Sequence, residues 1–370
     1  MDRFYRVHNG AVHRSMHALS EKATEAYEAA RKTVADFLHA SHADEILFTK
    51  NATEAINLVA RSWGETHLKK GDTVVLTTLE HHSNSVPWLQ LKERLGIEVE
   101  WIECDSQGSL DLNQYEKLLD SGRVKLVALT GQSNVLGVRP ALHAMITQAH
   151  AAGALVLVDA AQLAAHDAIN VTELDCDFLV FSGHKVYGPT GIGVLYGKRE
   201  LLKRMPPFLG GGEMVREVTR TGFTPADAPQ KFEAGTPPVA EAIGLAAALK
   251  WLQEIPLANR TAHEAHLLDL TLQQLLSVPG LRILGPANTS RISGCISFTM
   301  NGIHPHDIAE ILSKHHLLIR AGNHCAQVLH DSLGIPASAR ISIAIYNTET
   351  EIALLAPALL ESKKILSSEY

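Results

Sequence analysis

The sequence predicts an α/β protein with a large, doubly wound, mainly parallel sheet, followed by a smaller α+β domain. Between residues 46 and 196, short apolar runs alternate with helical patterns, which is typical of a parallel sheet with helices on both faces. After residue 249, helical patterns alternate with short strands again. At 370 residues the chain is long enough for two domains, and we place them at residues 1–248 and 249–370.

The elements of the first half follow from hydrophobic periodicity. Apolar and small residues at helical spacing predict a helix over residues 15–40. Strands are expected over four-to-six-residue apolar runs, and helices over the amphipathic stretches between them. The expected strands are 46–49, 73–77, 98–102, 124–129 and 154–159, and the further helices are 55–63, 112–119 and 142–152.

The second half begins with a buried strand end at 178–181 and a strand at 191–196. Many Gly and Pro residues make 205–238 a long irregular segment, and such segments are often functional. A helix over 239–253 then leads into the second domain. There we expect helices at 261–277 and 306–315, strands at 281–284, 294–299 and 341–345, and a last helix that runs to about residue 366.

Polar residues follow several of these strands. Asn51-Ala52-Thr53 stands between a strand and a helix, where free N–H groups and a hydroxyl could hold an anion, although a plain helix cap explains it as well. His81 and His82 follow the next strand, and Asp159 ends a later one. Because open α/β sheets place ligands at the carboxyl ends of their strands, these residues predict a site at one edge.

Lys185 lies in a Gly- and Pro-rich turn directly after a buried strand. A surface lysine in a loop is one interpretation, but a lysine at a strand end is costly to desolvate unless it is used. A Schiff-base lysine with an acidic partner for a pyridinium nitrogen is typical of pyridoxal phosphate (PLP) enzymes. Lys185, Asp159 and Cys325 together therefore predict a PLP enzyme with its own nucleophile. Another polar group, His13-Arg14, is either a site or a solvated start of the first helix.

Bulk properties exclude several other functions. A formal net charge of −7 argues against general nucleic-acid binding. The four cysteines are scattered, without a CxxC pair, which favours a reduced, cytoplasmic protein over a disulfide framework. The N-terminus lacks the apolar region of a signal peptide, and no run approaches the roughly 20 apolar residues of a membrane span. The twenty histidines show no metal-ligand spacing, so no metal site is expected.

Several motifs in the same order resemble the class V, fold-type I PLP-dependent enzymes, and among them the SufS/CsdA-like, group II cysteine desulfurases of the NifS-like superfamily. The resemblance covers nearly the whole chain from Tyr5 onward. It is carried by Ala11-Val12-His13-Arg14, Glu80-His81-His82, Ser133-Asn134-Val135-Leu136-Gly137, Val158-Asp159 with Gln162, Ser182-Gly183-His184-Lys185, Phe232-Glu233-Ala234-Gly235-Thr236 and Arg320-Ala321-Gly322-Asn323-His324-Cys325-Ala326.

The resemblance implies how the cofactor is held. Lys185 would bind PLP covalently, Asp159 would pair with the pyridine nitrogen, and Gln162 would hydrogen-bond the ring hydroxyl. His81 would stack on the ring and move protons. Thr53, Ser182 and His184, at a helix start and in neighbouring loops, would hold the phosphate. Thr236 would reach the phosphate of the other subunit, which implies a homodimer.

The resemblance also implies the substrate site and the reaction. Arg340 would bind the carboxylate of L-cysteine, since Arg suits bidentate binding better than Lys, and Asn134 would assist it. Cys325 would take sulfur as a persulfide and release L-alanine. The substrate-side residues are Arg340, Asn134, Arg320, His13 and Arg14. The persulfide would pass to a SufE-, CsdE- or SufU-like acceptor protein for iron–sulfur cluster assembly in the cytoplasm.

The sequence departs from the family at three points. Family members carry a further N-terminal segment, with a Leu-Asp-x-Ala-Ala-like strand that lines the substrate pocket. Asn323-His324 replaces the usual His-His before the nucleophile, and Ala52 stands where a second Thr is common.

Three alternatives to a cysteine desulfurase stay open at this stage. A selenocysteine lyase or cysteine-sulfinate desulfinase could use the same scaffold, and those substrates would need Cys325 less. A non-catalytic paralogue would not bind PLP. An aminotransferase would have no use for Cys325.

Overall fold

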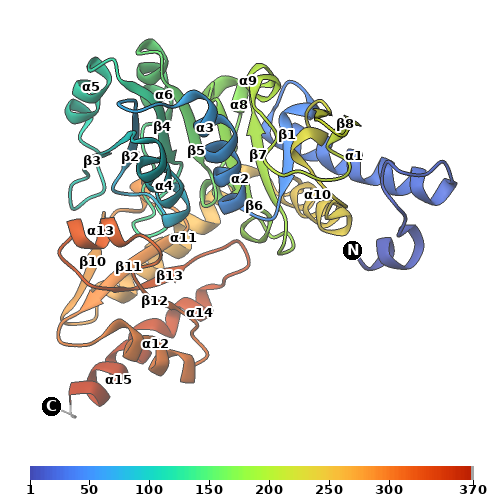
Figure 1. Ribbon diagram of the computed structural model, residues 1–370. Helices are drawn as coiled ribbons and strands as arrows, with labels where there is room; N and C mark the ends of the chain where they lie inside the picture. The colour runs from blue at the N-terminus through green and yellow to red at the C-terminus, as the bar shows by residue number, and fades with distance from the viewer. Residues whose placement is uncertain (368–370) are drawn as a thin grey trace.

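A seven-stranded sheet forms the centre of the larger part of the molecule (Figure 1). The structure is a computed structural model that describes residues 1–367. The strand order is β1-β7-β6-β5-β4-β2-β3, in which β2 to β6 pair in parallel and β7 pairs antiparallel with both β1 and β6. The strands are β1 Ile46–Thr49, β2 Thr73–Thr77, β3 Glu98–Ile102, β4 Val124–Thr130, β5 Leu155–Asp159, β6 Phe178–Ser182 and β7 Gly193–Gly197.

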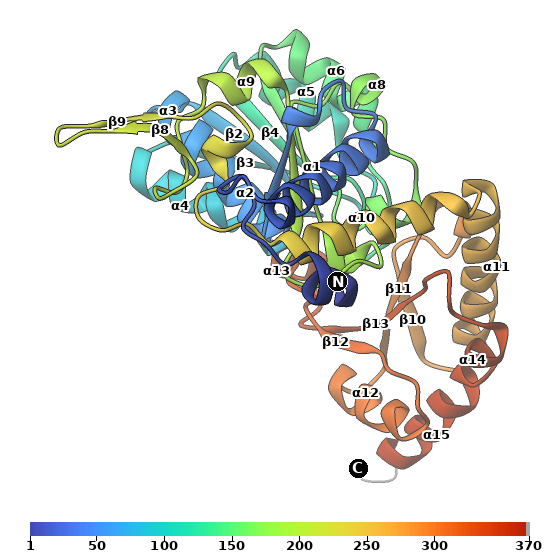
Figure 2. The ribbon, with the colours of Figure 1, turned by 90° about the vertical axis from the view of Figure 1, so that its right-hand side faces the viewer.

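Helices cover both faces of this sheet, as the alternating pattern predicts (Figures 1 and 2). Most of the predicted helices and strands of this part are found within a few residues of their expected ends. The helices are α1 Ala18–Leu38, α2 Ala52–Leu58, α3 Glu65–His67, α4 Val86–Leu95, α5 Leu112–Asp120, α6 Leu142–Ala151, α7 Leu163–His166, α8 Val171–Leu174, α9 Arg199–Arg204 and α10 Val239–Glu254.

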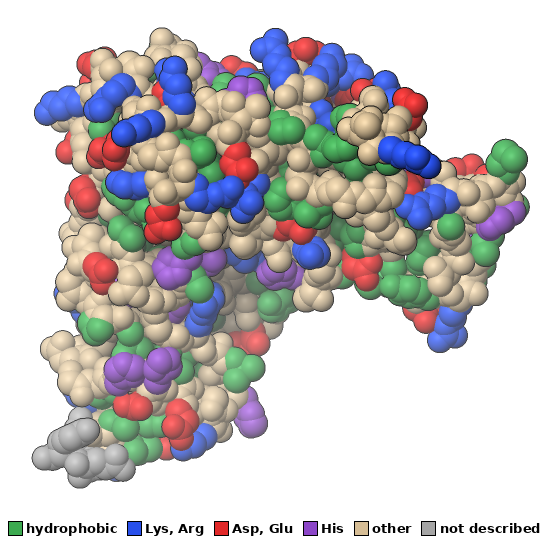
Figure 3. All heavy atoms as spheres, viewed as in Figure 1, with side chains coloured by type: hydrophobic (Ala, Val, Ile, Leu, Met, Phe, Trp, Pro, Cys, Tyr) green, Lys and Arg blue, Asp and Glu red, His purple; other side chains and the backbone are tan. Residues whose placement is uncertain are grey.

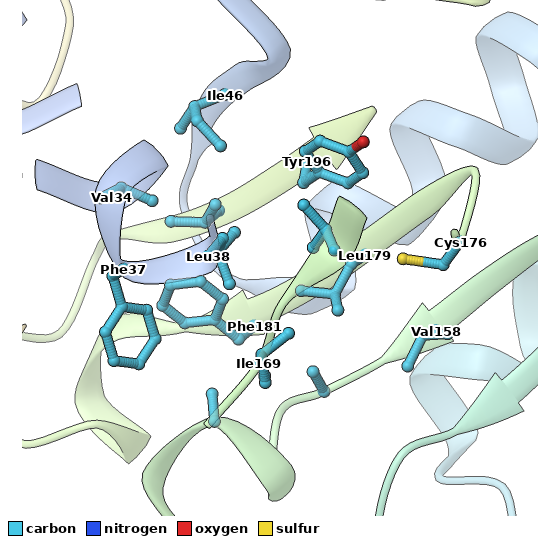
Figure 4. Packing of buried hydrophobic residues seen from close by; sticks show 14 of the residues in the cluster. Val34, Phe37, Leu38, Ile46, Val158, Ile169, Cys176, Leu179, Phe181 and Tyr196 are labelled. Atoms are coloured by element: carbon cyan, nitrogen blue, oxygen red, sulfur yellow. The ribbon is translucent and has the colours of Figure 1, made fainter. Parts of the chain in front are cut away.

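The first helix shows why the sheet face is stable. Helix α1 buries Ala23, Tyr27 and Val34 and packs against α10, while most of its charged residues are exposed. Phe37 meets Phe181 of the sheet with ring centroids 6.2 Å apart (Figure 4). Each fully buried Val, Leu or Phe side chain stabilises the fold by roughly 1.5–3 kcal/mol. This packing fixes the sheet on which the strand-end residues lie.

A four-stranded antiparallel sheet forms the smaller, C-terminal domain, in the order β10-β11-β13-β12. Figure 2 shows α10 running along the large domain and α11 turning along the small sheet. The strands are β10 Leu281–Leu284, β11 Cys295–Met300, β12 Arg320–Gly322 and β13 Ser338–Ser342, and the helices are α11 Leu257–Leu276, α12 Pro305–Lys314, α13 Gln327–Ser332, α14 Glu349–Ala353 and α15 Leu355–Ser367.

The structure differs from the sequence predictions in a few short elements. The segment 205–238, expected to be irregular, contains a hairpin of β8 Val215–Val218 and β9 Phe223–Pro225 that projects from the large domain (Figure 2). Strand β13 begins three residues before the predicted start at 341, because Ser338 and Ala339 pair with the neighbouring strands although they carry little hydrophobic signal. Among residues 1–367, no helix is long and apolar enough to cross a membrane.

Candidate active site

The carboxyl ends of the parallel strands meet at one edge of the large sheet and form a cavity of about 230 Å³. Asp159 ends β5, Ser182 ends β6 and Thr130 ends β4. This edge is where open α/β sheets bind ligands. The residues that line the cavity come from strand ends, from the α2 start, from the turn before α4 and from the small domain: Asn51, Ala52, Thr53, His81, Ser83, Thr130, Gln132, Asn134, Asp159, Ala161, Gln162, Ser182, His184, Lys185 and Arg320.

Asp159 is a buried carboxylate, only 4% exposed, and its Oδ1 accepts the Ala161 N–H at 2.9 Å. Burial raises its pKa, while the nearby Lys185 charge and the Ala161 N–H lower it. A buried carboxylate without a cation in direct contact is costly, so its environment favours a positively charged donor in the cavity. A protonated pyridine nitrogen is such a donor, and Asp159 therefore fits the cofactor that the sequence predicts.

Lys185 lies in the short turn Gly183–Lys185 after β6. Burial has the largest effect on the Lys185 amine and lowers its pKa. The negative charge of Asp159 partly offsets this decrease, whereas the positive charges of Arg340 and Arg320 lower the pKa further. A lowered pKa increases the neutral fraction of the amine, the form that attacks a carbonyl and accepts a proton.

His81 lines the cavity with its ring held by Ser83. The Ser83 N–H donates to His81 Nδ1 at 3.1 Å, so Nδ1 carries the lone pair and the proton of the neutral ring is on Nε2. Burial, followed by the Lys185 charge, lowers the pKa of His81 to about 4. His81 is therefore a neutral ring at neutral pH, which suits stacking on a cationic pyridine ring.

The polar groups expected to hold a phosphate lie at the same end of the cavity. Ser182 Oγ accepts the Ala52 N–H at 2.9 Å, which joins the β6 end to the α2 start. Thr53 and His184 are exposed and also line the cavity. Gln162, at the start of α7, lines it as well. The donors that a phosphate and a ring hydroxyl need are thus gathered in one place.

Two arginines of the small domain stand directly opposite each other, Arg320 on β12 and Arg340 on β13. Like charges in register across a sheet are destabilising unless an anion lies between them. Arg340 Nη1 donates to the Asn134 carbonyl at 2.9 Å, and its Nε is buried without a partner among the described residues. This arrangement can bind a carboxylate.

Cys325 lies on the loop between β12 and α13, beside this arginine pair. Arg320 Nη2 is 3.6 Å from Cys325 Sγ, and Arg320 itself lines the cavity that contains Lys185. Both His324 and Cys325 have left-handed backbone, with φ of 53° and 57°, which is uncommon for residues other than glycine. Asn134 Nδ2 donates to the His324 carbonyl at 2.7 Å and helps to hold this shape.

Three predicted site residues lie away from this cavity within one chain. His13 contacts Glu28 and Glu213, and Arg14 pairs with Glu213 at 2.5 Å. Thr236 lines a second cavity of about 280 Å³, next to Lys50 and Leu209. Sequence reasoning also missed cavity residues, namely Ser83, Thr130 and Gln132, although each follows a predicted strand and lies within a few residues of a motif named above.

His82 is a further residue that sequence reasoning did not assign. Its N–H donates to the Cys325 carbonyl at 2.7 Å, and its Nε2 accepts the Gln327 N–H at 3.0 Å. On the face shown in Figure 3, histidine side chains and Lys or Arg side chains lie around a hollow between the two domains. Among residues 1–367, no group of three or more His, Cys, Asp or Glu side chains is placed to bind a metal ion.

Comparison with known proteins gives consistent matches over the full length. The Aminotransferase class-V family matches residues 1–355. A cysteine desulfurase of Pectobacterium atrosepticum is 46% identical over 99% of this chain and 89% of its own length, and a probable cysteine desulfurase of Streptomyces coelicolor is 43% identical over 97% and 87%.

Solved structures match the fold equally well. The apo structure of a cysteine desulfurase from Thermococcus onnurineus has a TM-score of 0.94 at 41% identity, and it covers 98% of this chain and 90% of its own. The cysteine desulfurase CsdA from Escherichia coli, solved in an S-sulfonic acid form, has a TM-score of 0.91 at 40% identity with the same coverage.

Proposed function

The chain belongs to the class-V aminotransferase family, and we propose that the cavity around Lys185 and the loop of Cys325 together form its active site. It is a PLP-dependent cysteine desulfurase, with L-cysteine as substrate. One observation carries the assignment of the site. Arg320 lines the cavity of Lys185, contacts Cys325 Sγ and stands opposite Arg340, so one residue joins the cofactor side, the nucleophile and the carboxylate anchor.

The residues of the cavity fit PLP. Lys185 Nζ would hold it covalently, Asp159 would bind its pyridine N–H, and Thr53, Ser182 and His184 would bind its phosphate. When bound, PLP supplies an electron sink for the pair released as a bond to the substrate Cα breaks. Neutral His81 would stack on the ring, which keeps the ring in place without adding a positive charge next to it.

The substrate would be oriented by its carboxylate. Arg340 and Arg320 would bind the two carboxylate oxygens, which removes the unfavourable opposition of two like charges across β12 and β13. Lys185 Nζ, as a free amine, would take the proton from the substrate Cα, because burial favours the neutral form of this amine. Asn134 would keep Arg340 and the His324 carbonyl in register.

Cys325 would then receive the sulfur. Its Sγ, as a thiolate, attacks the substrate sulfur, so an S–S bond forms as the substrate Cβ–S bond breaks. The bonding electrons return to the carbon skeleton, which is protonated and leaves as L-alanine. Arg320, within 3.6 Å, would stabilise the negative charge on the sulfur before the attack.

The persulfide and its destination extend this proposal. A persulfide on a surface loop can be passed to a second thiol by exchange, so we assign the next step to a SufE-, CsdE- or SufU-like acceptor protein that supplies iron–sulfur cluster assembly in the cytoplasm. Thr236 lies outside the cofactor cavity of its own chain, which supports a homodimer in which it reaches the phosphate of the partner subunit.

The decisive experiment measures L-alanine and the persulfide together. Purified, PLP-loaded protein is given L-cysteine, with Cys325→Ala alongside, and the protein is then analysed by mass spectrometry. We expect L-alanine and a mass increase of one sulfur on the Cys325 peptide in the wild type only. L-Alanine release that persists in Cys325→Ala would refute the role of Cys325, and activity only with L-selenocysteine or cysteine sulfinate would favour the alternative substrates.

A further inference from the structure

A third and larger cavity lies between the two domains, outside the cofactor cavity. Its volume is about 600 Å³, within the range of small-molecule sites. The large domain contributes Ser109, Arg139 and His166, and the small domain contributes Glu264 and Arg291. None of these residues lines the cavity of Lys185.

Some polar groups of this cavity have hydrogen-bond partners, and others lack them among the described residues. Arg291 is exposed, donates to Ser109 Oγ at 2.9 Å across the two domains, and has no carboxylate partner among the described residues. Glu264 is 3% exposed, and its Oε2 contacts His166 Nδ1 at 2.8 Å. Its Oε1 is buried without a partner among the described residues. A buried acceptor of this kind is costly to leave unsatisfied.

The rest of the cavity wall combines apolar side chains with the hydroxyl groups of Thr261, Thr289, Ser290 and Ser293. The apolar side chains come from both domains, namely Leu110, Leu112, Val138, Met145, Leu268 and Ile292. Among the described residues, the cavity thus offers Arg291 as a cation without a carboxylate partner, Glu264 Oε1 as an acceptor without a partner, and several apolar side chains. A ligand that fits has an anionic group for Arg291, a hydroxyl for Glu264 and an apolar body.

A hydrogen-bond chain joins this cavity to the active site. Arg139 lines the inter-domain cavity, and its Nε donates to Gln132 Oε1 at 3.0 Å. Gln132 lines the cavity of Lys185 and also donates to the Ser293 carbonyl of the small domain at 3.0 Å. Arg139 Nη2 donates to Ser293 Oγ at 3.1 Å. A ligand that moves Arg139 therefore also moves the Gln132 side chain, which lines the cavity of Lys185.

We propose that the inter-domain cavity is an effector site for a small organic anion with an apolar body and a hydroxyl group. Binding of this anion would change the active site through Arg139 and Gln132. The site is separate from the one that carries the proposed function, so binding can be measured without turnover.

Phenylacetate and mandelate are suitable probes, because mandelate adds only a hydroxyl and neither carries an amine that could react with PLP. Isothermal titration calorimetry on the PLP-loaded protein compares the wild type with Arg291→Gln and with the control Arg282→Gln, an exposed arginine on β10 outside the cavity. We expect both anions to bind, mandelate more tightly. Arg291→Gln should weaken both by about ten-fold, as loss of one charged hydrogen-bonding group predicts, while Arg282→Gln leaves them unchanged.

The second readout is the KM for L-cysteine, which phenylacetate should change in the wild type and in Arg282→Gln but not in Arg291→Gln. Equal affinity in the wild type and Arg291→Gln would overturn the proposal, and competitive inhibition that persists in Arg291→Gln would assign the anion to the Arg320–Arg340 pair. Absence of saturable heat in the millimolar range would also overturn it, whatever the desulfurase activity.

Discussion

Two charged side chains of the proposed site are only partly satisfied by hydrogen bonds from the chain itself. Asp159 has only a backbone N–H, and Arg340 Nε has no partner among the described residues. A buried group of this kind lowers stability until a ligand satisfies it. The same residues that destabilise the free protein therefore provide the binding energy for cofactor and substrate.

Replacing Asp159 with Asn should separate these two effects. We expect the PLP-free variant to be more stable than the PLP-free wild type, because a buried, incompletely paired charge is removed. PLP should then stabilise the variant less than the wild type, and L-alanine formation should fall by about 100-fold or more, since the pyridine nitrogen loses its anionic partner. Thermal unfolding with and without PLP tests this, and equal stabilisation by PLP in both proteins would contradict it.

Arg340 should affect substrate binding more than cofactor binding. In Arg340→Gln we expect the KM for L-cysteine to rise by about ten- to hundred-fold, as expected for loss of a charged hydrogen bond to the carboxylate, with PLP retained. Arg282→Gln is the matched control on the same sheet. Steady-state kinetics and the PLP absorbance test this, and an unchanged KM would remove Arg340 from the substrate site.

Glu80 predicts a pH dependence of stability. Burial is the main effect on its carboxyl and raises the pKa from 4.5 to about 8, although Thr77, Asn84 and the Thr130 N–H all donate to it. The folded state then holds a proton that the unfolded state has lost, so this contribution is fully present below pH 4.5 and is lost as the pH rises to about 8. The slope is about 1.4 kcal/mol per pH unit at most.

In Glu80→Gln this part of the pH dependence should disappear. Urea unfolding of the PLP-free protein between pH 5 and pH 9 measures it, with PLP absent so that the cofactor does not titrate in the same range. A wild-type slope that is equally steep in the variant would assign the pH dependence to other groups.

Among the elements, the loop from β12 to α13 depends most on contacts from elsewhere in the chain. Its left-handed residues His324 and Cys325 are held by the His82 N–H on the Cys325 carbonyl and by the Gln327 N–H on His82 Nε2. Since a backbone N–H can only donate, His82 must be neutral with its proton on Nδ1. The loop geometry therefore depends on the protonation state of a residue about 240 positions earlier in the chain.

His82→Ala should loosen this loop while leaving PLP binding intact. We expect faster amide hydrogen exchange over residues 323–327 and slower single-turnover L-alanine formation, with partial rescue in His82→Gln, whose side-chain oxygen can accept the Gln327 N–H. Burial lowers the pKa of His82, so the neutral form is kept at neutral pH and is lost only on acidification below the usual histidine range. Exchange rates that are unchanged in His82→Ala would refute this role.

The long elements could be predicted from the sequence, because periodicity reports on packing. Strands β2, β3 and β5 and helix α1 are found close to their predicted ends. The three-residue strand β12 was not predicted, since three residues carry no period, and Arg320 was assigned through a motif instead. The opposition of Arg320 and Arg340 depends on the pairing of β12 with β13, which no local pattern specifies. The His82 contacts were missed for the same reason.

At the scale of the whole molecule, many specific hydrogen bonds join the two domains, and three of them lie beside the inter-domain cavity. Arg291 to Ser109, Arg139 to Ser293 and Gln132 to Ser293 all connect the large domain to the small one. The proposed active site also contains residues of both domains, since Lys185 comes from one domain and Cys325 from the other. The boundary between residues 248 and 249 stays a prediction. It is consistent with a chain that leaves the large domain along α10 and enters the small one along α11 (Figure 2).

The isolated chain also exposes apolar surface next to the cavity of Thr236, which bears on its assembly. Leu209, 45% exposed, lines that cavity with Phe208 and Pro237. The hairpin β8–β9, which projects from the same domain (Figure 2), exposes Val218 and Phe223, by 67% and 57%. Exposed apolar groups of this kind are typical of a protein–protein contact, and a second copy of the chain would bring its Thr236 to the neighbouring cofactor.

Leu209→Asp should therefore convert a dimer into monomers and weaken PLP binding by about ten-fold or more, because the phosphate loses a contact from the partner subunit. Leu318→Asp is the control, since Leu318 is 87% exposed and lies on the small domain outside both cavities. Light scattering gives the mass, and a PLP titration gives the affinity. If Leu209→Asp is monomeric but binds PLP as tightly as the wild type, each cofactor site is complete within one chain and Thr236 has no role in it. If both variants stay dimeric, the interface lies elsewhere, and Thr236→Ala alone then decides whether this residue reaches the phosphate.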